Sequence, residues 1–370
     1  MKILVAGDFL PSGRVVDLFD RKQYEIVFGQ VRERIKKADY SIVNLECPIC
    51  KGGEVPIEKS GPSHKCTDSA IGAILYAGFD GVTLANNHFR DFGDKGCENT
   101  LRQLAASSID YVGGGINSTE AAIILYKEIK GRLIAIINCC EHEFSIATEQ
   151  NAGSNPLNPI DQYYAIKEAR NKADYVIVIV HGGHEMWQLP SPRMKQTYQF
   201  FIDAGADAVV NHHQHCFSGY EIYKDRPIIY GLGNFCFDKP GYFRGLWEYG
   251  YMVEIETETN AITLLPYEQC CENPTVYLLD DKTIFEEQIR KLNDVISNEE
   301  LLIKETKCYY NKKRKRVALS LEPYSNKLFK SLYMRGILPS FVSKKKKKFF
   351  TNMLVCESQR DILTYFLQNR

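Results

Sequence analysis

The chain lacks a long hydrophobic run, and its amino terminus lacks the features of a secretory signal. Met1 to Asp8 contains only a short apolar run before a glycine and an acid, without the apolar core and small-residue cleavage site of a signal peptide. No apolar stretch approaches the roughly 20 residues that a membrane-spanning helix needs. These absences predict a cytoplasmic protein whose first residues form a core strand.

Clustered cysteine is also scarce, although the chain contains 12 cysteines among its 370 residues. Without a signal peptide we expect them to be reduced thiols. Cys47 and Cys50, followed by His64 and Cys66, could form a structural zinc site. A single C-x-x-C without a second one at a matching distance is a weak pattern, so we interpret these cysteines as buried thiols.

An excess of charge of one sign is absent overall, since 46 Lys and Arg balance 46 Asp and Glu. The balance is uneven, because residues 301–370 contain 17 basic and 4 acidic side chains, a net charge of +13. Two basic runs, 312–316 and 344–348, dominate this segment. We expect a solvated tail, with contact to an anionic membrane surface, a synthase or an anionic polymer as the alternatives. Nothing indicates specific nucleic-acid binding.

What the chain does have is a 44% hydrophobic composition and strand-like runs that alternate with helix-like segments, typical of a soluble α/β protein. Antiparallel pairs are expected within 122–138, 220–231 and 251–266, and helices at 93–107, 161–172 and 192–204. We place a core domain at 1–272, a helical region at 273–325 and a basic tail at 326–370.

Five predicted strands end in residue types that bind metals. In open α/β sheets, functional groups gather beyond the carboxyl ends of strands that lie only about 5 Å apart. A turn or a helix cap would explain each residue singly, but five such ends together favour one site. The residues are Asp8, Glu46, Asn87 with His88, His181, and His213 with His215.

This mixture of oxygen and nitrogen donors suits one or two divalent Mn, Fe or Zn ions better than Ca or Mg alone. Two ions about 3.5–4 Å apart, bridged by Glu46 or Asp8, would suit phosphoryl displacement. His88 would then be the general acid for the leaving oxygen, and Asp91 would orient its other nitrogen.

A set of short motifs follows in order along the first 235 residues. They are Gly7-Asp8, Asn44-Leu45-Glu46, Asn86-Asn87-His88 with Asp91 and Gly93, His181-Gly182-Gly183 with Glu185, Gly205-Ala206-Asp207, His212-His213-Gln214-His215 and Leu232-Gly233-Asn234-Phe235. Over roughly residues 1–257 this set resembles the CapA family of capsule and poly-γ-glutamate synthesis proteins, which are similar to calcineurin-type metallophosphoesterases.

The resemblance implies a four-layer α/β/β/α sandwich of metallophosphoesterase type, here with a helical C-terminal appendage. It implies that Asp8 and His215 bind one metal, that Asn87, His181 and His213 bind the other, and that Glu46 bridges them. His88 with Asp91 would be catalytic, and Lys59, Glu185 and Asn234 would line the substrate cleft.

The chain departs from ordinary metallophosphoesterases at several motif positions. Leu10 stands where they have a histidine, so the first metal would lose a ligand. Glu46 replaces an aspartate, while Asn211 and Gln214 stand where glycine and proline are common.

We therefore expect a metal-dependent, phosphoesterase-like hydrolase that acts on a phosphorylated or anionic polymer in capsule, poly-γ-glutamate or other surface-polymer biosynthesis. One alternative is a non-catalytic capsule-assembly factor with a degenerate metal or phosphate site, tethered through its tail to a membrane synthase complex. Amide-bond chemistry on a polyglutamate-like polymer is a third interpretation.

Overall fold

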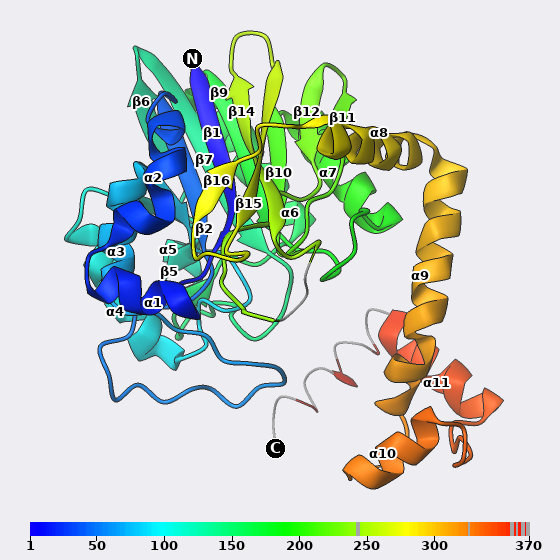
Figure 1. The fold of residues 1–370 in the computed structure, drawn as a ribbon. Helices are drawn as coiled ribbons and strands as arrows, with labels where there is room; N and C mark the ends of the chain where they lie inside the picture. The colour runs from blue at the N-terminus through cyan, green and yellow to red at the C-terminus, as the bar shows by residue number, and fades with distance from the viewer. Residues whose placement is uncertain (242–244, 325, 356–358, 360–361, 364–366, 368–370) are drawn as a thin grey trace. The chain divides into compact units, whose positions relative to one another are not determined.

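The computed structural model describes residues 1–370 except 242–244, 325, 356–358, 360–361, 364–366 and 368–370 (Figure 1). The chain forms two compact units, Met1–Leu302 and Ile303–Arg370. Both predicted boundaries, after residues 272 and 325, lie inside these units and remain predictions. The first unit contains both large sheets and the strand ends singled out in the sequence.

The first sheet has the strand order β16-β15-β14-β1-β2-β3-β4, and β13 pairs with the end of β1. Strands β1 to β4 and β13 are parallel, whereas β14, β15 and β16 join antiparallel. The bounds are β1 (Lys2–Phe9), β2 (Tyr40–Leu45), β3 (Gly81–Thr83), β4 (Asp110–Val112), β13 (Asn234–Cys236), β14 (Tyr249–Glu256), β15 (Ile262–Gln269) and β16 (Val276–Leu278).

The second sheet has the order β11-β12-β10-β9-β7-β6, with a parallel centre and an antiparallel pair at each edge. Its strands are β6 (Leu125–Ile129), β7 (Arg132–Cys140), β9 (Tyr175–His181), β10 (Ala208–His212), β11 (Tyr220–Tyr223) and β12 (Arg226–Ile229). The short strands β5 (Gly114–Gly115) and β8 (Gly153–Ser154) pair separately. The three antiparallel pairs expected from the sequence are confirmed.

Three apolar clusters define the layers of the first unit. One cluster lies between the sheets and includes Val5, Ile136 and Ile177, which project inward from β1, β7 and β9. A second packs the first sheet against α1 (Arg14–Asp20), α2 (Tyr24–Ile35), α3 (Ser69–Ala77) and α4 (Gly93–Ala105). A third packs the second sheet against α6 (Pro159–Lys172), α7 (Pro192–Ala204) and α8 (Thr283–Ser297).

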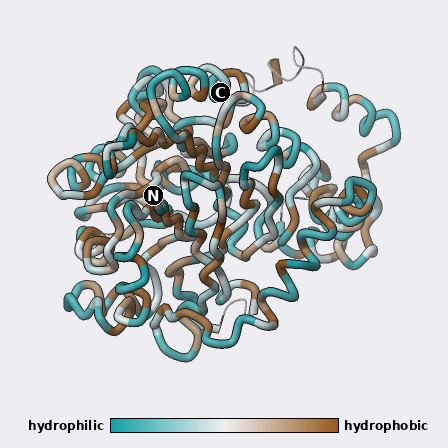
Figure 2. The backbone as a smooth tube through the Cα atoms, turned by 90° about the horizontal axis from the view of Figure 1, so that it is seen from above, coloured by the Kyte–Doolittle hydropathy of each residue, from teal (hydrophilic) through white to brown (hydrophobic). Residues whose placement is uncertain are grey.

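This stacking confirms the four-layer α/β/β/α sandwich, and Figure 2 shows hydrophobic backbone segments concentrated inside it. The one-turn helix α5 (Ser118–Ala121) lies between β5 and β6 in sequence. The C-terminal helices are α9 (Glu299–Leu319), α10 (Lys327–Met334) and α11 (Lys344–Val355), so the helical appendage is confirmed as well. None of the described helices combines the length and apolar composition needed to cross a bilayer.

Candidate metal centre

The two sheets meet through buried polar side chains at the carboxyl ends of their strands. Asn44 on β2 donates from Nδ2 to Oδ1 of Asp8 on β1 at 2.8 Å. The same amide nitrogen lies 3.3 Å from Nδ1 of His181, at the end of β9 in the other sheet. Because parallel strands present their carboxyl ends on one edge, residues 8, 44 and 181 become neighbours despite their separation in the sequence.

A first group of potential metal ligands consists of Glu46, His181 and His213, all buried. Nε2 of His181 lies 3.0 Å from Nδ1 of His213 and 3.5 Å from Oε1 of Glu46. The Oδ1 atom of Asn87 also lies 3.0 Å from this nitrogen. One imidazole nitrogen carries at most one proton, so it cannot satisfy three such neighbours by hydrogen bonding alone.

A second group consists of Asp8, Glu46 and His215, which are buried as well. Nδ1 of His215 lies 2.8 Å from the side-chain oxygen of Asn234, which fixes the ring. Nε2 of the same ring then faces Oε1 of Glu46 at 3.7 Å. Fixing one ring nitrogen so that the other faces the donor group is how proteins orient metal-binding histidines.

Glu46 belongs to both groups, and both of its carboxylate oxygens are buried without a hydrogen-bond partner. Leaving a buried carboxylate unpaired is costly, which makes these oxygens the strongest sign that the site holds a cation. Burial, followed by the nearby charge of Asp8, raises the pKa of Glu46 well above its ordinary value. A divalent cation between the two groups would stabilise the ionised carboxylate.

Burial has the opposite effect on the imidazoles at this site. It lowers the pKa of both His181 and His215 well below the ordinary value, and the neighbouring His213 adds to the effect. Both rings are therefore neutral at neutral pH, which is the form that binds metals. The residues present thus fit one or two divalent ions.

The loop after β10 adopts a strained backbone that aims its two ligand histidines. His213 and His215 have φ values of 93° and 54°, in the left-handed region that side-chain-bearing residues rarely adopt. The backbone N–H of His213 donates to Oδ2 of Asp8 at 3.2 Å, which ties the strained loop to β1. Such strain is concentrated at functional sites.

His88 and Asp91 form a pair beside the two ligand groups. Nδ1 of His88 lies 2.6 Å from Oδ2 of the fully buried Asp91. Asp91 also forms an ion pair with Lys59 and accepts the backbone N–H of His64 at 2.7 Å. Lys59, expected in the substrate cleft, therefore contacts the His88 and Asp91 pair directly.

The structure thus brings together all six predicted metal ligands, and it places the predicted catalytic pair and Lys59 beside them. Asn234 contacts His215, and the charge of Glu185 is close enough to raise the pKa of Glu46. Their roles in binding and catalysis remain predictions. Leu10 is buried in the outer apolar cluster, so its side chain cannot replace the missing histidine.

Sequence reasoning missed two charged residues near the site. Glu143 accepts from Nδ2 of Asn87 at 3.3 Å, and its other oxygen lies 3.8 Å from Nε2 of His213. The amine of Lys239 lies 4.5 Å from the ring centre of Phe237 and 4.6 Å from that of Trp247. The strand-end rule could have found Glu143, since it follows β7 by three residues.

The cysteines take no part in either ligand group among the residues that the structure describes. Cys47, Cys50 and Cys66 are buried and unpaired. Burial raises the pKa of Cys47 well above its ordinary value, which keeps this thiol protonated and inert. This agrees with their interpretation as buried thiols.

Comparisons with known proteins find relatives of this chain. A family model described as bacterial capsule synthesis protein PGA_cap matches residues 2–239. The capsule biosynthesis protein CapA of Bacillus anthracis is 31% identical over 247 residues, covering 65% of this chain and 60% of that protein. The PGA biosynthesis protein CapA of Bacillus subtilis (strain 168) is 29% identical over 236 residues, covering 63% and 62%. The match therefore spans about 60% of the length of these relatives.

Two solved structures are similar to this chain at low sequence identity. A hypothetical protein from Thermus thermophilus has a TM-score of 0.46 and 18% identity, covering 72% of this chain and 99% of that one. A phosphatase from Mycoplasma pneumoniae has a TM-score of 0.44 and 14% identity, covering 79% and 98%.

Proposed function

The chain belongs to the bacterial capsule synthesis protein family PGA_cap, and from this premise we propose that it hydrolyses phosphoester bonds at a divalent metal centre. The proposed substrate is a phosphorylated intermediate of a capsule, a poly-γ-glutamate or another anionic surface polymer. Relatives are named for capsule and PGA biosynthesis, which supports this choice of pathway.

The observation that carries the proposal is the pair of ligand groups that share Glu46, whose oxygens are buried and unpartnered. Asp8 and His215 would hold one ion, and His181, His213 and Asn87 the other. Bound divalent ions would lower the pKa of the attacking water and neutralise charge on the phosphoryl oxygens.

The chain's own residues would orient the substrate and move a proton. With Nδ1 of His88 held by Asp91, Nε2 is the nitrogen available to protonate the leaving oxygen. Asp91 is fully buried, and its contacts with Lys59 and the backbone N–H of His64 hold it in place.

Elemental analysis of purified protein, combined with assays on phosphodiester substrates, tests the proposal. We expect Glu46→Ala, His181→Ala and His213→Ala each to lower metal content and to abolish hydrolysis. His142→Ala is the matched control, since His142 is exposed and belongs to neither ligand group. Unchanged metal content and unchanged hydrolysis in all three site variants would refute the proposal.

One observation favours a second candidate, a binding protein that holds a metal and a phosphate or anionic polymer without turnover. Leu10 is 1% exposed in the outer apolar cluster, so the Asp8 side of the site has one ligand fewer than ordinary metallophosphoesterases. If the first ion binds weakly, its contribution to two-metal catalysis of phosphoester hydrolysis is lost.

Turnover separates the two candidates. A protein that binds metal through Glu46 and His181, yet hydrolyses no phosphoester with Mn, Fe or Zn supplied in excess, would be the binding protein. A Leu10→His variant that gains metal and activity together would show that the missing ligand limits catalysis.

A further inference from the structure

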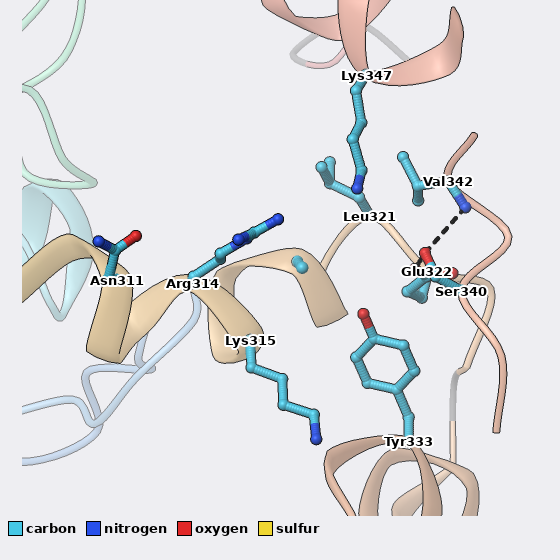
Figure 3. A pocket seen from close by; sticks show the side chains of 10 residues that line it. Asn311, Arg314, Lys315, Leu321, Glu322, Tyr333, Ser340, Val342 and Lys347 are labelled. Carbon is cyan, nitrogen blue, oxygen red and sulfur yellow. Dashed lines mark hydrogen bonds between the residues drawn. The ribbon is translucent and has the colours of Figure 1, made fainter. Parts of the chain in front are cut away.

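The second compact unit, Ile303–Arg370, contains a pocket of its own, apart from the metal centre in the first unit. Its volume is about 340 Å³, which lies at the lower end of the range for small-ligand sites. Figure 3 shows side chains from α9, α10 and α11 around it. Arg314 and Lys315 project from α9, and Lys347 extends from α11.

The walls of this pocket are held by a small folded network. The ring of Tyr324 packs against that of Tyr333, with ring centres 5.4 Å apart, and edge-on to that of Phe341 at 5.9 Å. Its hydroxyl donates to the backbone oxygen of Pro339 at 2.5 Å. These contacts tie α10 to the segment before α11, so the pocket is built by packing.

Glu322 is the acid among the residues that line the pocket, and its oxygens are already used. Oε2 accepts the backbone N–H of Phe341 at 2.7 Å, and Oε1 accepts the hydroxyl of Ser340. Burial alone would raise the pKa of Glu322, but these bonds and one from Tyr333 outweigh it and lower the pKa. Glu322 therefore holds the walls together.

The three cations of the pocket have no such partners. No ion pair joins Arg314, Lys315 or Lys347 to an acid within the part of the chain that the structure describes. The segment that contains them, residues 301–370, has a net charge of +13. Arg314, Lys315 and Lys347 are exposed and carry the same charge, while the one carboxylate of the lining, Glu322, is hydrogen-bonded to the pocket wall, so a bound anion would reduce the repulsion between the cations.

We propose that this pocket binds a phosphate group, with the forked guanidinium of Arg314 and the amine of Lys347 as its ligands. Arginine donates two parallel hydrogen bonds to phosphate oxygens, and lysine adds point charges. The phosphate belongs either to an anionic lipid headgroup or to a free phosphorylated compound. The pocket size accepts either source.

Binding measurements on the full chain test the proposal with two probes, glycerol phosphate in solution and phosphatidylcholine vesicles with or without phosphatidylglycerol. Arg314→Gln and Lys347→Gln should each weaken binding to the preferred probe by about tenfold or more, because each removes a charge-assisted hydrogen bond.

Two control variants each remove one positive charge from α9 or α11, at a residue that does not line the pocket. Lys313→Gln on α9 removes an amine that lies over the Tyr309 ring, and Lys345→Gln alters α11. The controls should not change binding of glycerol phosphate, and they should weaken vesicle binding by about fivefold at most.

Each outcome decides the question. Pocket-specific loss with vesicles alone identifies a lipid headgroup, and pocket-specific loss with glycerol phosphate alone identifies a free phosphorylated ligand. Equal losses in pocket and control variants would overturn the proposal in favour of diffuse attraction by the basic runs. Absence of binding to both probes would overturn it as well.

Discussion

At the residue scale, His88 is the side chain whose role can be separated most clearly from metal binding. It contacts Asp91 at 2.6 Å and belongs to neither group of potential metal ligands. We predict that His88→Ala lowers kcat on alkyl phosphodiesters by about 10²–10⁴-fold, because the leaving oxygen loses its proton donor. The kcat on substrates with a nitrophenolate leaving group, which needs no proton, should fall much less in steady-state assays.

His64 provides the control for this prediction, since its ring lies 4.6 Å from that of His88. Burial and the neighbouring His88 lower the pKa of His64 to about 3, so this ring is neutral at neutral pH and cannot act as the general acid. His64→Ala should leave the dependence on the leaving group intact. An equal loss on both substrates in His88→Ala would show that His88 is not the acid.

Glu143 acts through Asn87, whose amide it orients. By accepting from Nδ2 at 3.3 Å, Glu143 leaves Oδ1 of Asn87 directed at Nε2 of His181. We predict that Glu143→Ala weakens metal affinity by about 10–100-fold, the usual effect of removing a residue that orients a ligand. Titration with Mn or Zn, monitored by calorimetry, measures the change in metal affinity.

Glu143→Gln should restore most of the affinity, because its amide oxygen can still accept from Asn87. The exposed Glu149 provides a control in Glu149→Ala, which should bind metal like the unaltered protein. If Glu143→Ala binds metal with unchanged affinity, Asn87 is either oriented by other contacts or not a ligand.

At the scale of elements, local signals fixed most helices and strands. The bounds predicted for α7, residues 192–204, are those observed, because every signal there is local. Pro192 begins the helix, the Ser191 side chain caps it by accepting from Met194, and Gly205 ends it with a φ of 125°. The donor residues were likewise found because each lies at the end of a strand or within a few residues of it.

Long-range pairing set the features that the sequence did not predict. Strand β3 ends at Thr83, and just beyond it the N–H of Ala85 donates to the side chain of Asn138 on the other sheet. The pairing of β1 with β13 and β14 joins residues more than 200 positions apart. Such contacts depend on the whole sheet, and no local pattern encodes them.

Glu254 on β14 joins three elements by ion pairs. Its carboxylate is 4% exposed and lies 2.9 Å from Nζ of Lys2 on β1 and 2.6 Å from Nη2 of Arg34 on α2. Burial alone would raise the pKa of Glu254, but the hydrogen bonds from these two cations outweigh it and lower the pKa below its ordinary value. We predict that Glu254→Gln lowers the free energy of unfolding by about 1–2 kcal/mol at neutral pH.

The pH dependence of this effect follows from the lowered pKa. Stabilisation by an ionised Glu254 is complete above the unfolded-state pKa and is lost as pH falls through the lower folded-state pKa. Urea unfolding at a series of pH values should therefore show the two proteins converging in acid. Glu287→Gln, which breaks an exposed pair with Lys291, should change stability little at any pH. A constant difference down to strongly acidic pH would contradict the assignment.

At the scale of the whole molecule, α8 belongs to the sandwich although it follows the core domain expected from the sequence. Phe285 and Ile289 pack into the cluster between the sheets, and Ile296 packs into the cluster beside α7. All three side chains are at most 6% exposed. Apolar burial of this extent contributes about 1.5–3 kcal/mol for each side chain.

Shortening the chain from its C-terminus should therefore lower the stability of the sandwich only once α8 is removed. We predict that a chain ending at residue 310, which keeps α8 and the buried Leu302, binds metal and melts close to the full chain. A chain ending at residue 281 exposes the surface under α8 and should lose at least about 3 kcal/mol of stability, even after the entropy of ordering the helix is subtracted. Thermal unfolding of the two truncated chains with and without Mn measures their stability and their metal binding. Equal melting of the two truncated chains would mean that α8 contributes nothing to the sandwich, and unfolding of the longer one would mean that the first unit depends on the second.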